Sequence, residues 1–180
     1  MLAKVADRHA VLTMPRLLRP LFRRRRELLT ELGRSAAEAV TELVRRSLGD
    51  DVRPDVVVSI ATAGDLVRWH PHVHLLTTDG AKAADAPGMP LPECNGTLLM
   101  SLFRRRLLAR LVEALAISPE LVRKLLAWRH PGFSAHVAEP ISPEQKPRLG
   151  TPPPTSSAIP SPSRSSSTST GRGPSSTARA

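Results

Sequence analysis

The sequence contains no tyrosine and a single cysteine, Cys94, and aromatic residues make up only 3% of its 180 positions. One cysteine excludes an intramolecular disulfide and a zinc site built from cysteines. No apolar run reaches the roughly 18 residues that a membrane-spanning helix needs. Charged residues also interrupt the N-terminus before a signal-peptide core develops. We therefore expect a cytoplasmic protein that does not enter a membrane.

Acidic residues are few relative to basic ones: 26 Lys and Arg oppose 16 Asp and Glu, which gives a net charge of +10. Such an excess favours nucleic acid as a partner, because binding a phosphate backbone releases condensed counterions. An arginine-rich composition without such a partner would give the same balance. Among the basic runs, Arg104, Arg105 and Arg106 are candidates for contacts with DNA, and a solvated helix end is the competing interpretation. The run Arg23–Arg26 would fan out around a helix and form no single stripe.

The composition changes sharply at Ser142. The 39 residues from 142 to 180 include 11 Ser, 8 Pro and 5 Thr and only two large aliphatic side chains. Burying so little apolar surface does not offset the loss of chain entropy on folding. We therefore predict a folded domain over residues 1–141 and a disordered tail over residues 142–180.

Hydrophobic patterns within residues 1–141 predict strands at 10–14, 55–62, 69–78 and 133–137 and helices at 21–48, 97–116 and 119–128. Gly49 is expected to end the first helix, and Ser118 followed by Pro119 to start the last one. The β-branched strand at 55–62 is expected to be buried on both faces. Because strands follow one another closely, the order predicts an α+β fold with a mainly antiparallel sheet.

The residues with the clearest chemistry lie in the predicted strand at 69–78. Side chains alternate across a strand, so His70, His72 and His74 share one face. Neighbouring positions on a face lie roughly 6.5–7 Å apart, so one metal ion takes only a neighbouring pair. Pro71 has no amide donor and is expected at the start or edge of a strand, which favours His72 and His74 over His70 as ligands. Imidazole suits several transition metals, so the pattern does not name the ion. Half-exposed histidines without a metal are the competing interpretation.

Aspartate and tryptophan residues near the histidine strand and elsewhere also have expected roles. Asp65 and Asp79 flank the histidine strand and are expected to cap turns, with metal ligation as the alternative. Trp69 and Trp128 are expected to anchor the core, because aromatic residues are so scarce, and stacking on DNA bases is the alternative.

Three blocks of the chain, Arg8–Pro20, Val57–Gly80 and Trp128–Val137, resemble the two-tyrosine rolling-circle insertion-sequence transposases of the HUH superfamily, which is named for its His-hydrophobic-His motif. With the connecting helices they span about residues 8–139. The middle block is the most specific, because a strand, a Gly-Asp break and the run Trp-His-Pro-His-Val-His occur there in one order.

The resemblance implies a Rep-like HUH sheet with packed helices. On this sheet His72 and His74 would help to hold a divalent metal, Mg²⁺ or Mn²⁺, which polarises a phosphate of single-stranded DNA. A tyrosine would then attack that phosphate and form a covalent phosphotyrosine. The sequence departs from the family in lacking any tyrosine and in lacking the cysteine-rich region that commonly precedes the catalytic domain. It also carries Ala61 where relatives often have a polar residue.

From these observations we expect a fragment of a DNA transposase that binds metal and DNA but does not nick DNA. The abrupt change of composition at residue 142 suggests a truncated or frameshifted transposase copy. One alternative is a non-catalytic DNA-binding or regulatory fragment that competes with the full-length transposase. Another is a fragment without function.

Overall fold

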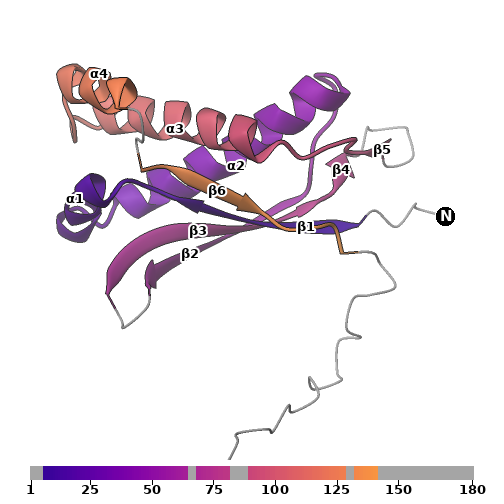
Figure 1. Cartoon of the computed structure of the whole chain (residues 1–180), viewed down its shortest axis with the longest axis horizontal. Helices are drawn as coiled ribbons and strands as arrows, with labels where there is room; N and C mark the ends of the chain where they lie inside the picture. Colours follow the sequence, from indigo (N-terminus) through magenta and orange to yellow (C-terminus); the bar gives the residue numbers. More distant parts are fainter. Residues whose placement is uncertain (1–5, 65–67, 82–88, 129–131, 142–180) are drawn as a thin grey trace, which may run out of the picture. The chain divides into compact units, whose positions relative to one another are not determined.

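In the computed structural model, four antiparallel strands form a sheet on which two long helices pack (Figure 1). The structure describes residues 6–64, 68–81, 89–128 and 132–141. All of these lie within one unit, residues 1–146. The predicted α+β fold with an antiparallel sheet is thus confirmed. The predicted disordered tail, residues 142–180, lies outside the described residues.

The sheet has the spatial order β2-β3-β1-β6, and every pairing in it is antiparallel. Its strands are β1 (Asp7–Thr13), β2 (Val56–Ala63), β3 (Trp69–Thr78) and β6 (Ser134–Val137). A separate two-stranded ribbon joins β4 (Gly80–Ala81) to β5 (Met89–Pro90). The order makes β3 and β1 the central strands, so the predicted histidine strand lies inside the sheet.

The helices are α1 (Arg19–Arg24), α2 (Leu28–Leu48), α3 (Gly96–Glu113) and α4 (Pro119–Ala127), and a 3-10 turn, η1 (Arg16–Leu18), precedes α1. As predicted, α2 ends at Gly49, whose φ of 108° is a conformation that favours glycine. As predicted, α4 begins at Ser118, whose hydroxyl oxygen accepts a hydrogen bond from the Leu121 amide.

The prediction of one helix over residues 21–48 is wrong, because the chain breaks into α1 and α2 at Arg25. That residue has φ −119° and ψ 82°, which is not helical. Phe22 before the break and Leu28 after it are both buried. The Arg25 side chain donates hydrogen bonds to the Glu27 carboxylate and to the carbonyl oxygen of Ala114. Leu21 and Leu28, on either side of the break, are seven positions apart, a spacing that keeps the helical period, so the hydrophobic pattern did not indicate the break.

The core lies between one face of the sheet and the helices α2 and α3. Leu12 on β1 and Val73 and Leu75 on β3 are fully buried there. The edge strand β2 behaves differently, since Val57 is 64% exposed. The expectation that strand 55–62 is buried on both faces is therefore wrong. β-Branched residues fit a pleated surface whether or not its second face is covered.

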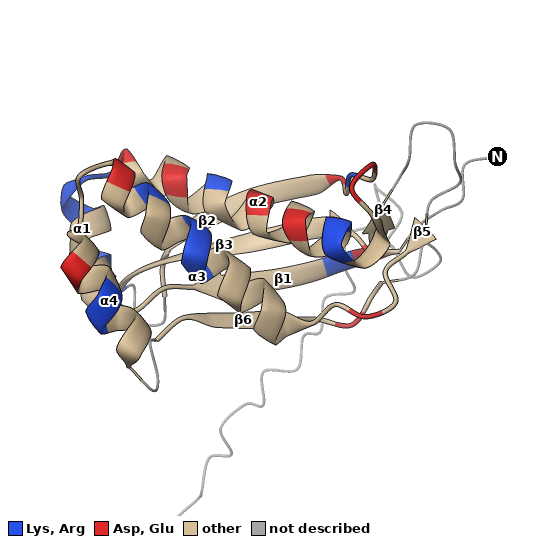
Figure 2. Ribbon diagram, turned by 90° about the horizontal axis from the view of Figure 1, so that it is seen from above, with Lys and Arg blue, Asp and Glu red and all other residues tan. Residues whose placement is uncertain are grey.

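Ion pairs connect the outer surfaces of α2 and α3, where Figure 2 shows acidic bands on α2 beside basic bands on α3. Glu42 accepts hydrogen bonds from Arg46, Arg105 and Arg106. Burial raises the pKa of the Glu42 carboxyl, but the hydrogen bonds from Arg106 and Arg105 outweigh burial and hold that pKa below its usual range. Arg105 and Arg106 therefore stabilise the contact between the two helices.

No helix in the described part of the chain combines the length and hydrophobicity that crossing a membrane requires.

Candidate functional site

Five of the described histidines lie on the face of the sheet opposite the helices, namely His9, His70, His72, His74 and His136. Because Leu12 and Val73 point into the core, the residues that alternate with them point to the other face. His72 and His74 on β3 and His9 on β1 therefore share this face, which we call the histidine face. The register places Val11 opposite His74, so His9 lies diagonally across from it.

The imidazole rings of His70, His72, His74 and His9 form a continuous row. The centroid distance is 5.2 Å between His70 and His72, 4.9 Å between His72 and His74, and 5.3 Å between His74 and His9. The side chains of all four residues are half-buried. The two predicted ligands are therefore neighbours in a larger cluster, and the cluster includes His9, which no pattern in the sequence indicates as part of the site.

A backbone hydrogen bond determines the tautomer of His72. Its Nδ1 lies 2.7 Å from the carbonyl oxygen of His70. A carbonyl oxygen only accepts, so Nδ1 of His72 must carry the proton. In the neutral ring the other nitrogen, Nε2, then holds a free electron pair. This is the state that an imidazole needs to bind a metal through Nε2.

His74 is oriented in a similar way by a side chain. Its Nδ1 lies 3.1 Å from Nε2 of His9, and the two rings are stacked with an interplanar angle of 14°. When Nδ1 of His74 donates this hydrogen bond, its Nε2 is left free, as in His72. Burial lowers the pKa of His74, and the neighbouring His72 and His9 lower it further. The neutral ring is therefore favoured, and only a neutral imidazole binds a metal ion.

The neighbouring strands β1 and β2 place no acidic, cysteine or histidine side chain directly opposite His72 or His74. Ala61 on β2 faces His72 directly, and Ser59 faces His74. In the described part of the chain, no group of three or more His, Cys, Asp or Glu side chains is arranged to hold a metal ion. Binding of a metal ion by His72 and His74 therefore stays a prediction.

Pro71 lies in a central strand, where a missing amide donor would normally disrupt the pairing. Around Pro71 the sheet loses no backbone hydrogen bond, because the pairing on both sides of β3 is interrupted there. The pairing of β3 with β1 ends at His72, and the pairing with β2 shifts register between Ala61 and Ala63. The proline thus sits where neither neighbour requires its donor. Pro71 was expected at the start or the edge of a strand. It lies near the start of β3, which begins at Trp69, but β3 is not an edge strand.

Asp79, expected to cap a turn, instead forms an ion pair. Its carboxylate accepts two hydrogen bonds from Arg8, at 2.6 Å and 3.0 Å. The hydrogen bond to Asp79 raises the pKa of Arg8, although burial opposes this. Arg8 also donates to the carbonyl oxygen of Ala138, so the pair ties β1 to the segment that follows β6. The other aspartate of that prediction, Asp65, lies outside the described residues.

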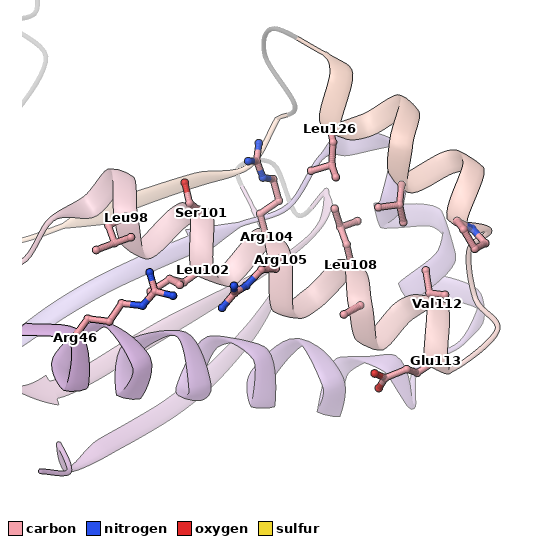
Figure 3. A pocket seen from close by; sticks show the side chains of 13 residues that line it. Arg46, Leu98, Ser101, Leu102, Arg104, Arg105, Leu108, Val112, Glu113 and Leu126 are labelled. Carbon is pink, nitrogen blue, oxygen red and sulfur yellow. The ribbon is translucent and has the colours of Figure 1, made fainter. Parts of the chain in front are cut away.

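The predicted DNA contacts Arg104, Arg105 and Arg106 lie on α3, on the opposite side of the sheet from the histidine face. Arg105 and Arg106 pair with Glu42. Arg104 and Arg105 also line a largely apolar groove of about 730 Å³ beside α3 and α4 (Figure 3). Contact of these three residues with DNA stays a prediction.

Comparison with known proteins gives one partial match. Over 72 residues the chain is 39% identical to the transposase for insertion sequence element IS801 from Pseudomonas savastanoi pv. phaseolicola. The match covers 40% of this chain and 17% of that protein, so it spans only about a sixth of the relative's length. No family model matches the chain, and no solved structure matches it. The similarity supports a relationship to transposases.

Proposed function

We propose that residues 1–141 form a metal-binding and DNA-binding domain of the HUH rolling-circle transposase type. The observation that carries the proposal is the pair His72 and His74. They lie on one face of a central strand, and each ring can direct a free Nε2 away from its own hydrogen bond. The similarity to an insertion-sequence transposase supports DNA as the partner. A bound Mg²⁺ or Mn²⁺ would supply a positive charge that polarises a DNA phosphate.

We further propose that these residues do not nick DNA on their own. The sequence has no tyrosine, so it supplies no phenol to form a phosphotyrosine. A serine or threonine hydroxyl would need a base beside it to act as nucleophile. Thr13 lies opposite His72 on the histidine face, but its hydroxyl shares a hydrogen bond of 2.6 Å with the Ser134 hydroxyl.

The proposal is tested by incubating the protein with a labelled single-stranded oligonucleotide and Mn²⁺. We expect the DNA to shift on a native gel, with an affinity that falls as salt rises. We expect no labelled protein on a denaturing gel, where a covalent adduct would survive. A covalent adduct would refute the lack of nicking, and the absence of any DNA binding would refute the assignment to a DNA-binding domain.

His9 is expected to strengthen metal binding by holding His74 in place. Replacing a residue that orients a metal ligand typically lowers metal affinity about 10–100-fold. We expect a fall of that size in His9→Leu, which has no acceptor for the His74 Nδ1 proton. His9→Gln, whose amide oxygen accepts a hydrogen bond, should retain more of the affinity. Calorimetric titration with Zn²⁺, on protein without a polyhistidine tag, measures the effect.

His136→Leu provides the matched control for His9, because His136 faces Val11 on the same side of the sheet and is exposed. ¹⁵N NMR of the ring nitrogens gives a second readout. In the wild-type protein it should show a proton on Nδ1 of His74. Equal Zn²⁺ affinities for His9→Leu and His136→Leu would remove the role assigned to His9.

A further inference from the structure

A separate hollow, formed by η1, α1 and the start of β3, is lined by arginines and by no described acidic residue. It has a volume of about 370 Å³. Its lining consists of Arg16, Arg19, Pro20, Arg23, Arg68 and Trp69. We call it the arginine hollow.

Three of its arginines come from one helical face. Arg16, Arg19 and Arg23 are separated by three and then four positions, and residues at this spacing are neighbours on a helix surface. Arg16 and Arg23 are exposed, and Arg19 is half-buried. This stripe differs from the consecutive run Arg23–Arg26, whose side chains point in different directions.

The arginines of the stripe have no acidic partners among the described residues, in contrast to Arg105 and Arg106 on α3. The Nε atom of Arg19 is buried and has no hydrogen-bond partner in the described structure. Burial lowers the pKa of Arg19, and the positive charge of Arg16 lowers it further. Like charges held together without a counterion repel one another, so an anion bound between them would lower the energy of the cluster.

The hollow is held together by tertiary contacts. The indole Nε1 of Trp69 donates a hydrogen bond of 2.9 Å to the carbonyl oxygen of Arg19, which ties β3 to α1. The guanidinium of Arg26 lies 5.3 Å from the centre of the Trp69 ring, within the range of a cation–π contact. Trp69 is half-buried and packs against the core, as predicted, and it also forms part of the wall of the hollow. The same role is wrong for Trp128, which is 50% exposed.

We propose that the arginine hollow binds phosphate groups of single-stranded DNA, an inference that rests on the proposed function. Guanidinium groups offer several donors in a planar fork that matches phosphate oxygens. Trp69 and His72 are three residues apart on β3, about 10 Å along the strand. The Trp69 side chain contacts Arg19 of α1, whereas His72 lies on the histidine face, so the hollow and the candidate metal site are separate sites at the same end of β3.

The double variant Arg16→Ala/Arg23→Ala tests this proposal. We expect its affinity for a fluorescein-labelled single strand, measured by anisotropy, to fall at least about tenfold. Each lost phosphate contact should also reduce the slope of log K against log salt by about 0.7, so the slope should become shallower by about 1.4. The control Arg24→Ala/Arg123→Ala removes the same charge from two exposed positions outside the hollow. It should bind within about twofold of the wild-type protein, because neither residue lines the hollow.

Trp69 provides an independent readout in the variant Trp128→Phe, which leaves it as the sole tryptophan. Saturating single-stranded DNA should change its fluorescence, and adding Arg16→Ala/Arg23→Ala should abolish that change at the same DNA concentration. Inorganic phosphate should displace the DNA more effectively than chloride at equal ionic strength.

Several results would overturn the assignment of the hollow. Equal losses of DNA affinity in the hollow variant and in its charge-matched control would show that net charge alone is responsible. A hollow variant that keeps DNA binding but loses binding to phosphatidylglycerol vesicles would indicate a membrane surface as the ligand. A wild-type protein that binds no single-stranded DNA would defeat the proposed function itself, which is a different failure from unchanged binding by Arg16→Ala/Arg23→Ala.

Discussion

Replacing His72 and His74 together by alanine is expected to lower the affinity for Mn²⁺ or Zn²⁺ at least about 100-fold. Loss of an outer residue that only orients a ligand costs about 10–100-fold, and removal of two direct ligands should cost more. The two rings are adjacent in the histidine row, and His72 has its Nδ1 proton committed to the His70 carbonyl. Their Nε2 atoms are therefore the donors that an ion would meet.

Isothermal titration calorimetry on untagged protein measures this affinity, and electron paramagnetic resonance of Mn²⁺ gives a second reading. His136→Ala is the control, because it removes an exposed histidine from the same face without touching the pair. Thermal unfolding should show that the double variant remains folded, since both rings lie outside the core. If His72→Ala/His74→Ala binds Mn²⁺ and Zn²⁺ as tightly as His136→Ala, the metal site is elsewhere or absent.

The second large effect concerns stability. We expect Asp79→Ala to lower the free energy of unfolding by about 3 kcal/mol, because removing one partner of a buried ion pair leaves the other charge buried and unpaired. The side chains of Arg8 and Asp79 are only 12% and 9% exposed, and they join through two hydrogen bonds. Such a loss is a large share of the roughly 5–15 kcal/mol that stabilises a domain of this kind.

Urea unfolding followed by circular dichroism gives the free energy for each variant. Glu120→Ala is the matched control, because it breaks an ion pair of 2.8 Å in which both side chains are about two-thirds exposed, 66% and 64%. Exposed pairs contribute only about 0.3–0.5 kcal/mol. The role given to the Arg8–Asp79 pair would be wrong if Asp79→Ala were no more destabilised than Glu120→Ala.

Local patterns predicted much of the fold. The period of the apolar residues placed the helices at 97–116 and 119–128 within a few positions of α3 and α4. The predicted helix end at Gly49 and helix start at Ser118 are also confirmed. Both depend on local effects, because a glycine's freedom at positive φ and a serine's capping hydroxyl act within a few residues. Alternation along one strand correctly placed His72 and His74 on the same face.

The sequence by itself thus determined the fold class, the candidate ligand pair and the excess of positive charge. The tertiary structure alone decided which surfaces those features meet. His9 and His74 are 65 positions apart in the chain, and only the pairing of β1 with β3 brings their rings together. Similarly, Arg105 and Arg106 reach acids on α2, whereas Arg16 and Arg19 meet none among the described residues. Local periodicity determines which way a side chain points. Its partner, however, depends on contacts between segments that are distant in the sequence, and a local pattern does not predict those contacts.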